Sequence, residues 1–407
     1  MATTDLEQTP VYPVAGVRLA TVQAGIRYRE RRDLVVIELA ENSRTAAVFT
    51  RNAFCAAPVV VAREHLAHSA GDTRYLLINA GNANAGTGER GRQDALRSCE
   101  TLAGSADVPV AAVLPFSTGV IGEHLPMDRL LAGIGAALPR LAADGWQEAA
   151  RGIMTTDTRP KLRSRQVETA TGTVTLTGFC KGAGMIRPDM ATMLAYLFTD
   201  AAVSQKDLQQ LLRSATEQSF NRITVDGDTS TNDACTLSAT GQSAVALSAG
   251  DGEDWQAFSK AVHELMQELA ISIIHDAEGA RKFVTVDVTG GGNSEECLRV
   301  AYAIAESPLV KTALTASDPN WGRILAAVGR AGIRELDVGR VRIWLDDVPI
   351  VSGGMVDEHY REAAGQAVMQ QESIRITVDL ARGEVAERVW TSDLSEEYVR
   401  INASYRS

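Results

Sequence analysis

The chain has 407 residues, of which 45% are hydrophobic and 5% aromatic, and it carries a net charge of −11. Because a single core stops growing at roughly 250 to 300 residues, we expect two lobes. The acidic balance and the lack of a long basic run argue against a nucleic-acid partner, since phosphate binding needs clustered Lys and Arg. No apolar stretch approaches the roughly 18 residues of a membrane helix, and the start MATTDLEQTP resembles neither a signal nor a transit peptide. We therefore expect a cytoplasmic protein that acts on small molecules, without a membrane partner.

Short β-patterned runs alternate with amphipathic segments, which is typical of an α/β protein with mixed β-sheets layered with helices. The first clear strand is predicted at 174–176. It is followed by the segment CKGAGMIRPDMATMLAYLFTD at 180–200, in which a loop rich in Gly and containing Pro runs into an apolar strand at 192–198. Thr192 therefore lies at a boundary between loop and strand.

Two helices and several strands are predicted farther along the chain. A helix starts at Ser204, which with Asp207 forms a start like a capping box. A second helix covers 255–274, and its apolar stripe indicates packing and no cofactor role. The steps Asp346-Asp347 and Arg382-Gly383 predict hairpin turns. Strands are predicted at 284–288, 341–343 and 374–378.

The five cysteines are scattered singly, with no Cys-x-x-Cys pair, so we expect reduced thiols and no zinc site. Cys180 lies close to the loop before Thr192 and is an alternative candidate for a catalytic nucleophile. The remaining cysteines are Cys55, Cys99, Cys235 and Cys297.

A threonine hydroxyl is a weak nucleophile unless a base removes its proton. A threonine at a chain terminus has such a base in its own α-amine, whose unperturbed pKa is about 8. Thr192 would gain that amine if its hydroxyl attacked the Ala191 carbonyl and cut the bond between them, a step that a strained loop would ease. The spacing by itself also fits a surface loop that leads into an ordinary core strand.

Several long motifs occur in one order along nearly the whole chain. They include FTRNAFCAAPV (49–59), INAGNANAGTG (78–88), STGVIG (117–122), IMTTDTRPK (153–161), KGAGMIRPDMATML (181–194), FNRITVDGDTSTND (220–233), HDAEGARK (275–282), DPNWGRI (318–324) and YVRINASYRS (398–407). With these motifs the chain resembles the ornithine acetyltransferase family, the glutamate N-acetyltransferases of arginine biosynthesis. His275 and Ala277 depart from the Arg and Gly expected in relatives, whereas Glu278 is retained.

The resemblance implies a self-cleaving enzyme of the N-terminal-nucleophile type, with an α fragment of residues 1–191 and a β fragment of residues 192–407. In such an enzyme the acetyl group moves from N-acetylornithine to Thr192 and then to glutamate, without a cofactor. The fragments are expected to stay together and to assemble into a heterotetramer. The residues leave open whether acetyl-CoA also serves as an acetyl donor.

The resemblance also assigns roles to individual residues. Thr192 is the nucleophile, and Thr118 and Gly119 in STGVIG are the donors of the oxyanion hole, although without the resemblance this motif is typical of a plain turn. The expected substrate contacts, besides Thr192 itself, are Thr158, Lys181, Glu278, Asn402 and Ser407.

The acidic stretch TVDGDTSTND contains Asp226, Asp228 and Asp233, which invite a calcium interpretation. The stretch lacks the glycine and the terminal glutamate of an EF-hand loop, so no metal site is expected. We predict instead a loop near the active site whose Asp and Asn side chains bind backbone groups.

Two other functions stay open on sequence grounds. An N-terminal-nucleophile amidohydrolase or aminopeptidase would use water as the acyl acceptor. An inactive binding protein could keep the same fold, but an uncut chain would not present the Thr192 amine.

Overall fold

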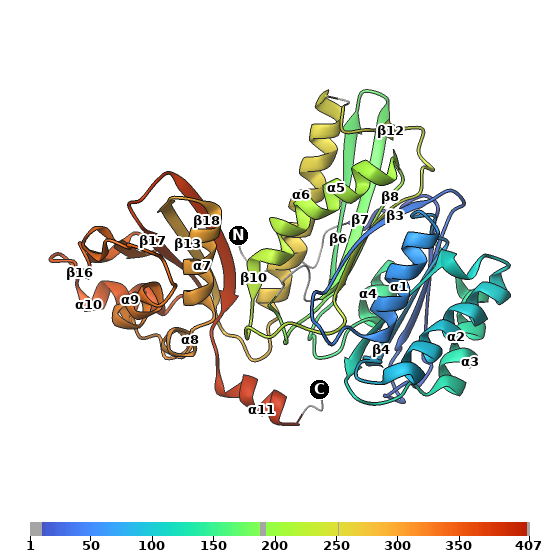
Figure 1. Cartoon of the computed structure of the whole chain (residues 1–407), viewed down its shortest axis with the longest axis horizontal. Coiled ribbons are helices and arrows are strands. Elements are labelled where there is room, and N and C mark those ends of the chain that lie inside the picture. The colour runs from blue at the N-terminus through green and yellow to red at the C-terminus, as the bar shows by residue number, and fades with distance from the viewer. Residues whose placement is uncertain (1–9, 188–192, 251, 405–407) are drawn as a thin grey trace.

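The computed structural model describes residues 10–187, 193–250 and 252–404, which form two lobes (Figure 1). The N-terminal lobe contains two stacked sheets with helices on both outer faces. Its first sheet has the order β1 (Val17–Val22), β2 (Leu34–Leu39), β4 (Tyr75–Asn82) and β5 (Val113–Val120). Its second sheet has the order β3 (Arg44–Phe49), β11 (Ala234–Ala239), β8 (Leu194–Thr199), β7 (Gly172–Lys181) and β6 (Lys161–Thr169). The predicted mixed sheets layered with helices are confirmed.

The central strand β8 explains how the layers pack. Every residue from Leu194 to Thr199 is buried, as expected for a strand covered on both faces. Because side chains alternate, Tyr196 and Phe198 pack between the two sheets, while Ala195 and Leu197 face the outer helices. Those helices are α5 (Gln205–Glu217) and α6 (Gly252–His275). The outer face of the first sheet packs against α2 (Gly88–Ala106) and α3 (Met127–Ala137).

Smaller elements complete this lobe. Helix α4 (Trp146–Gly152) places Trp146 in the core between the sheets, in edge contact with Phe198 at 5.5 Å between ring centroids. Helix α1 (Ala57–His68) packs on β5, and β9 (Ala202–Val203) pairs with β12 (Ala246–Leu247).

The predicted helices are confirmed. Ser204 caps α5 by accepting the Asp207 backbone N–H at 3.1 Å, and α6 includes all of the predicted range 255–274. Within the described residues, none of the helices combines the length and hydrophobicity needed to cross a bilayer.

The C-terminal lobe is built on a seven-stranded sheet. Helices α7 (Ser294–Ala305), α8 (Pro308–Thr315), α9 (Trp321–Gly329) and α10 (Glu362–Met369) pack against it. The strand order is β10 (Ile223–Thr224), β18 (Val385–Ser392), β13 (Phe283–Gly291), β17 (Ser373–Asp379), β14 (Arg342–Leu345), β15 (Val348–Ser352) and β16 (Met355–Val356). Strand β10 comes from the chain between α5 and β11, so it ties the two lobes together.

One of the two predicted hairpins is wrong. Asp346-Asp347 joins the antiparallel neighbours β14 and β15 as predicted. Arg382-Gly383 connects β17 and β18, but these strands lie on opposite sides of β13 and do not pair with each other. The backbone N–H groups of Arg382 and Gly383 both donate to the Gly290 carbonyl, at 2.7 and 2.9 Å, so the turn passes over the end of β13.

The two lobes differ from the two fragments expected from the sequence. The bond between Ala191 and Thr192 lies outside the described residues. Strand β7 lies in the expected α fragment, whereas its neighbour β8 lies in the expected β fragment, and Lys181 to Leu176 pair with Leu194 to Thr199. Fragments divided at this bond would therefore share one hydrogen-bonded sheet.

Candidate active site

Thr118 and Gly119 lie at the end of β5, where its pairing with β4 becomes irregular beside Gly81 and Asn82. Gly119 has a φ of +133°, and a Cβ there would lie 2.2 Å from the Gly81 carbonyl carbon. Only glycine fits this close approach. The side chain of Asn232 ties the acidic loop to the same strand end by donating to the Ser117 carbonyl at 2.9 Å.

A cavity opens where the ends of β5 and β7 meet the acidic loop and α11 (Glu396–Ser404), the helix that returns from the C-terminal lobe (Figure 1). It holds about 630 Å³ of empty space, part of which is open to solvent. Five predicted site residues line it together with Met193: Thr118, Gly119, Lys181, Glu278 and Asn402. The other lining residues are Ala83, Ile121, Thr155, Thr156, Gly184, Met185, Ile186, Ser230, Thr231, Asn232 and Asp233.

The three other predicted residues are not among the described residues that line this cavity. Thr192, with its neighbour Ala191, and Ser407 lie outside the described residues. Thr158 is described, but its hydroxyl and its N–H both donate to Asp276, the N–H at 3.1 Å. Within the same motif, Thr155 and Thr156 line the cavity and Thr158 does not, so the substrate contact of Thr158 stays a prediction.

Lys181 is the cation of the cavity. Among the described residues, its amine has no hydrogen-bond or ion-pair partner, although it lies among charged groups. Burial lowers the pKa of Lys181 below its ordinary value, while Asp157, Asp233 and Glu278 act in the opposite direction. An unpaired amine in this position suits the carboxylate of an entering ligand.

Glu278 follows α6 and connects the cavity to the C-terminal helix. The carboxylate of Glu278 is buried and accepts a hydrogen bond from the Asn402 side chain at 2.7 Å. Its backbone N–H donates to the Ala183 carbonyl at 2.9 Å, which fixes the acid beside the chain that follows Lys181. The end of the chain therefore contributes to the wall of the cavity.

The prediction for the acidic loop is confirmed, since its Asp and Asn side chains bind backbone groups beside the cavity. Asp226 accepts the N–H groups of Met185 and Ile186 at 2.7 and 2.9 Å and the Tyr398 hydroxyl at 3.1 Å. These bonds link the loop, the chain after β7 and α11.

Asp233 has a position in the cavity that the sequence did not reveal. Its side chain is buried, and its Oδ2 has no hydrogen-bond partner among the described residues. Burial raises the pKa of Asp233 well above its usual range, against the effects of Ser230 and Lys181. The available signal was its place directly before the fully buried strand β11.

Cys180 and His275 do not line the cavity. Cys180 is buried at 3.7 Å from the Leu269 carbonyl, and burial raises the pKa of its thiol to about 12. A thiolate is therefore disfavoured, which removes Cys180 as the alternative nucleophile. The His275 ring stacks on Phe283 with centroids 4.3 Å apart and does not line the cavity.

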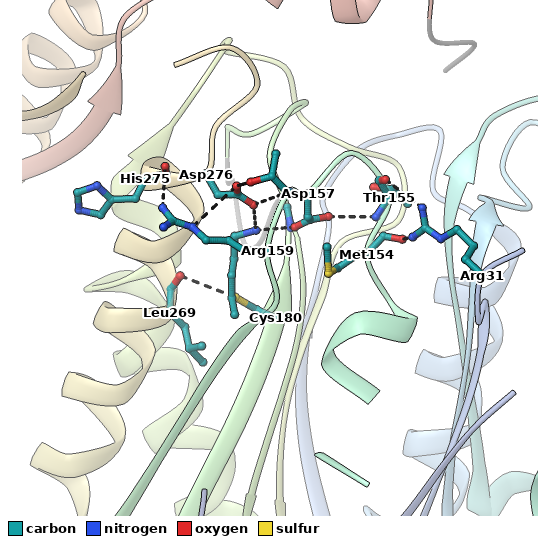
Figure 2. Close-up of polar contacts among 12 residues, drawn as sticks. Arg31, Met154, Thr155, Asp157, Arg159, Cys180, Leu269, His275 and Asp276 are labelled. Carbon is teal, nitrogen blue, oxygen red and sulfur yellow. Dashed lines mark hydrogen bonds and ion pairs between the residues drawn. The ribbon is translucent and has the colours of Figure 1, made fainter. Parts of the chain in front are cut away.

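Sequence reasoning also missed a buried ion cluster next to the cavity. The Lys161 amine lies 2.6 Å from a carboxylate oxygen of Asp157 and 2.6 Å from one of Asp276. Figure 2 shows Asp157 and Asp276 close together. The motif IMTTDTRPK contained two of these three residues, but the third is more than a hundred positions away.

The layered lobe and the polar cavity at its strand ends define a mixed α/β enzyme whose site suits a small charged substrate. A family model described as the ArgJ family matches residues 18–407. The chain is 54% identical over 398 residues to the arginine biosynthesis bifunctional protein ArgJ of Pseudomonas syringae pv. tomato, covering 98% of each. The chain therefore belongs to the ArgJ family and is an enzyme of arginine biosynthesis.

Two solved structures are also similar to this chain. The arginine biosynthesis bifunctional protein argJ from Bacillus halodurans shares 38% identity, with a TM-score of 0.48, over 51% of this chain and 96% of that one. Ornithine acetyltransferase from Mycobacterium tuberculosis, solved with ornithine, shares 35% identity, with a TM-score of 0.39, over 46% of this chain and 98% of that one.

Proposed function

We propose that this enzyme transfers the acetyl group of N2-acetyl-L-ornithine to L-glutamate through an acetyl-Thr192 intermediate, giving L-ornithine and N-acetylglutamate. The observation that supports this most directly is that Thr118, Gly119, Lys181, Glu278 and Asn402, from distant parts of the sequence, line one cavity with the neighbour of Thr192. Family membership and the relatives' names point to the same reaction.

The proposed chemistry starts when the Thr192 hydroxyl attacks the Ala191 carbonyl, so that the peptide bond breaks and an ester forms. Water then hydrolyses this ester, which gives the Ala191 carboxylate, restores the Thr192 hydroxyl and leaves the Thr192 α-amine free to act as a base. The Thr192 hydroxyl then loses its proton to that amine and attacks the acetyl carbonyl, and Thr118 and Gly119 donate to the developing oxyanion. The proton passes to the departing α-nitrogen as the amide bond breaks and ornithine leaves. Glutamate's amine attacks the acetyl ester in the second half and returns the hydroxyl to Thr192.

The proposed substrate contacts follow from charge. Lys181 is the cation available for a carboxylate, while Glu278, supported by Asn402, is available for an ammonium group. Thr155 and Thr156 supply hydroxyl groups on the same wall, and Ser407 is the contact proposed beyond the described residues.

The assembly and cofactor expectations belong to the same proposal. The reaction balances without a cofactor, and acetyl-CoA is the donor to be tested for a second activity, because the relative from Pseudomonas syringae is named bifunctional. The two fragments, sharing one sheet, would pair into a heterotetramer in the cytoplasm.

The covalent route predicts ping-pong kinetics. N-acetylornithine by itself should leave an acetyl group on the fragment that begins at Thr192, because the first half of the reaction needs no acceptor. Added glutamate should remove the group. Mass spectrometry of the quenched reaction measures this, and parallel double-reciprocal lines should accompany it. Intersecting lines without an acetylated fragment would contradict the intermediate, whereas acetate release independent of glutamate would favour the hydrolase alternative.

The contact between α11 and Glu278 predicts a role for the end of the chain. Asn402→Ala leaves the buried Glu278 carboxylate without its amide donor, which should lower kcat/KM for ornithine formation by about 5- to 150-fold, the range for one unpaired buried group. Self-cleavage should persist because it depends on Thr192 and the oxyanion hole.

A matched control lies on the same helix. Arg400 is exposed and pairs only with Glu397 among the described residues, so Arg400→Ala should leave kcat/KM within about twofold of the original value, as for most exposed ion pairs. Equal kinetics for the Asn402 and Arg400 variants would show that α11 is only an ordinary chain end.

A further inference from the structure

The cluster of Lys161, Asp157 and Asp276 holds three charged groups away from water. The side chains of these residues are 1%, 1% and 3% exposed, respectively. Burial of charged groups costs several kcal/mol per ion, and well-packed apolar residues often replace such clusters without loss of stability. Stability is therefore a weak explanation for the cluster, and its contacts indicate another role.

Each carboxylate of the cluster holds a segment that lines the cavity. Asp157 accepts the Thr155 N–H at 3.0 Å through Oδ2 and the Gly182 N–H at 2.7 Å through Oδ1, the atom that also contacts Lys161. Asp276 holds Thr158 and lies two residues before Glu278. The cluster thus joins the threonine wall, the end of β7 and the acid of the site.

The charges of Lys161 and Lys181 both act on the carboxylate of Asp157. Asp157 is buried, which would raise its pKa, but Lys161, Lys181 and the Gly182 hydrogen bond hold that pKa at about 2. Lys161 makes the close contact, at 2.6 Å, while Lys181 has no such partner among the described residues and lines the cavity. Removal of Lys161 would leave an uncompensated carboxylate beside the Lys181 amine.

We propose that Lys161 is a positioning residue of the active site: by pairing with Asp157, it keeps the Lys181 amine directed to the cavity and available for a substrate carboxylate. The identity of that carboxylate, an amino-acid substrate, rests on the proposed function.

The first test is a set of variants with a kinetic readout. Lys161→Met should raise KM for N-acetylornithine by at least about tenfold, the cost of one charge-assisted contact, with a smaller change in kcat. Adding Asp157→Asn should recover most of that loss, because the competing charge is gone. A structural role for Lys161 would give no such recovery.

Lys311 provides a matched control. Its side chain is as buried, at 2% exposed, and its amine donates to Thr391 at 2.9 Å in the C-terminal lobe. Lys311→Met should change Tm without raising KM. A KM increase equal to that of Lys161→Met would overturn the proposal, since any lost buried lysine would then suffice.

The pH dependence of kcat/KM also separates a positioning role of Lys161 from a purely structural one. Lys181 is faced by Asp157, Asp233, Glu278 and Lys161. Lys161→Met removes a positive neighbour, so the pKa of Lys181 should rise and the alkaline limb of kcat/KM should move to higher pH. Asp157→Asn removes a negative neighbour, so the limb should move to lower pH, and the double variant should lie between them. Limbs that move in the same direction, or not at all, would overturn the proposal.

The proposal can still be tested if Lys161→Met does not fold or if the enzyme transfers no acetyl group. If Lys161→Met does not fold, Asp157→Asn and the double variant, which leave no carboxylate at position 157, still decide by KM. The two should have similar KM values for N-acetylornithine, and a KM at least about tenfold higher in the double variant would overturn the proposal. If the unmodified enzyme transfers no acetyl group, the proposed function is wrong. Calorimetric titration with ornithine then ranks the same variants, and equal affinities would overturn the role of Lys161.

Discussion

Replacement of Thr192 by alanine is expected to leave a single uncut chain and to abolish acetyl transfer. The hydroxyl that would attack the Ala191 carbonyl is missing, and the α-amine proposed as the base is never released. The unaltered protein should separate under denaturing conditions into fragments of residues 1–191 and 192–407. Intact mass spectrometry measures both results.

Thr192→Ser is the matched control, because it keeps a hydroxyl on the β-carbon of the same residue. It should cut and transfer, at altered rates, while the alanine variant does neither. Without denaturant the cut protein should migrate as one particle, since β7 and β8 pair across the proposed cleavage site. An unaltered protein that stays uncut after prolonged incubation at neutral pH would contradict the mechanism.

Gly119→Ala is expected to lower kcat by about 100- to 1,000-fold, the effect of losing one oxyanion donor. The added Cβ would lie 2.2 Å from the Gly81 carbonyl carbon, and that backbone atom cannot move aside without shifting the ends of β4 and β5. The φ of +133° adds strain for any residue with a Cβ. Self-cleavage should slow as well, because the same donors would face the Ala191 oxyanion. Rates of cutting and of ornithine formation measure the two effects.

Gly122 gives a control three residues away. It also has a positive φ, +83°, but a Cβ there meets no atom within 4 Å. Gly122→Ala should therefore introduce backbone strain only. A strain of roughly 1 kcal/mol should change kcat by less than about tenfold. If both variants lose activity to the same degree, backbone strain and not displacement of the oxyanion donors is responsible.

Local sequence signals were sufficient for the elements that local physics determines. Ser204 and Asp207 marked the start of α5 because a helix cap is made within one turn. The apolar run predicted as a strand at 192–198 marked β8, described from Leu194 to Thr199, because a strand covered on both faces needs no polar side. Motif resemblance supplied Thr118, Gly119, Lys181, Glu278 and Asn402, which the fold brings to one cavity.

Tertiary structure decided what depends on partners far away in the chain. Arg382-Gly383 has turn composition, yet no hairpin forms because β13, about ninety residues earlier, pairs with both flanking strands. Thr158 and Thr155 are three positions apart in one motif. Asp276 binds Thr158, whereas Thr155 lines the cavity. The same acid also pairs with the buried Lys161, together with the nearby Asp157. Composition and periodicity describe a residue and its near neighbours. The turn at Arg382-Gly383 and the contacts of Thr158 and Lys161 depend instead on a strand or a carboxylate that is distant in the sequence.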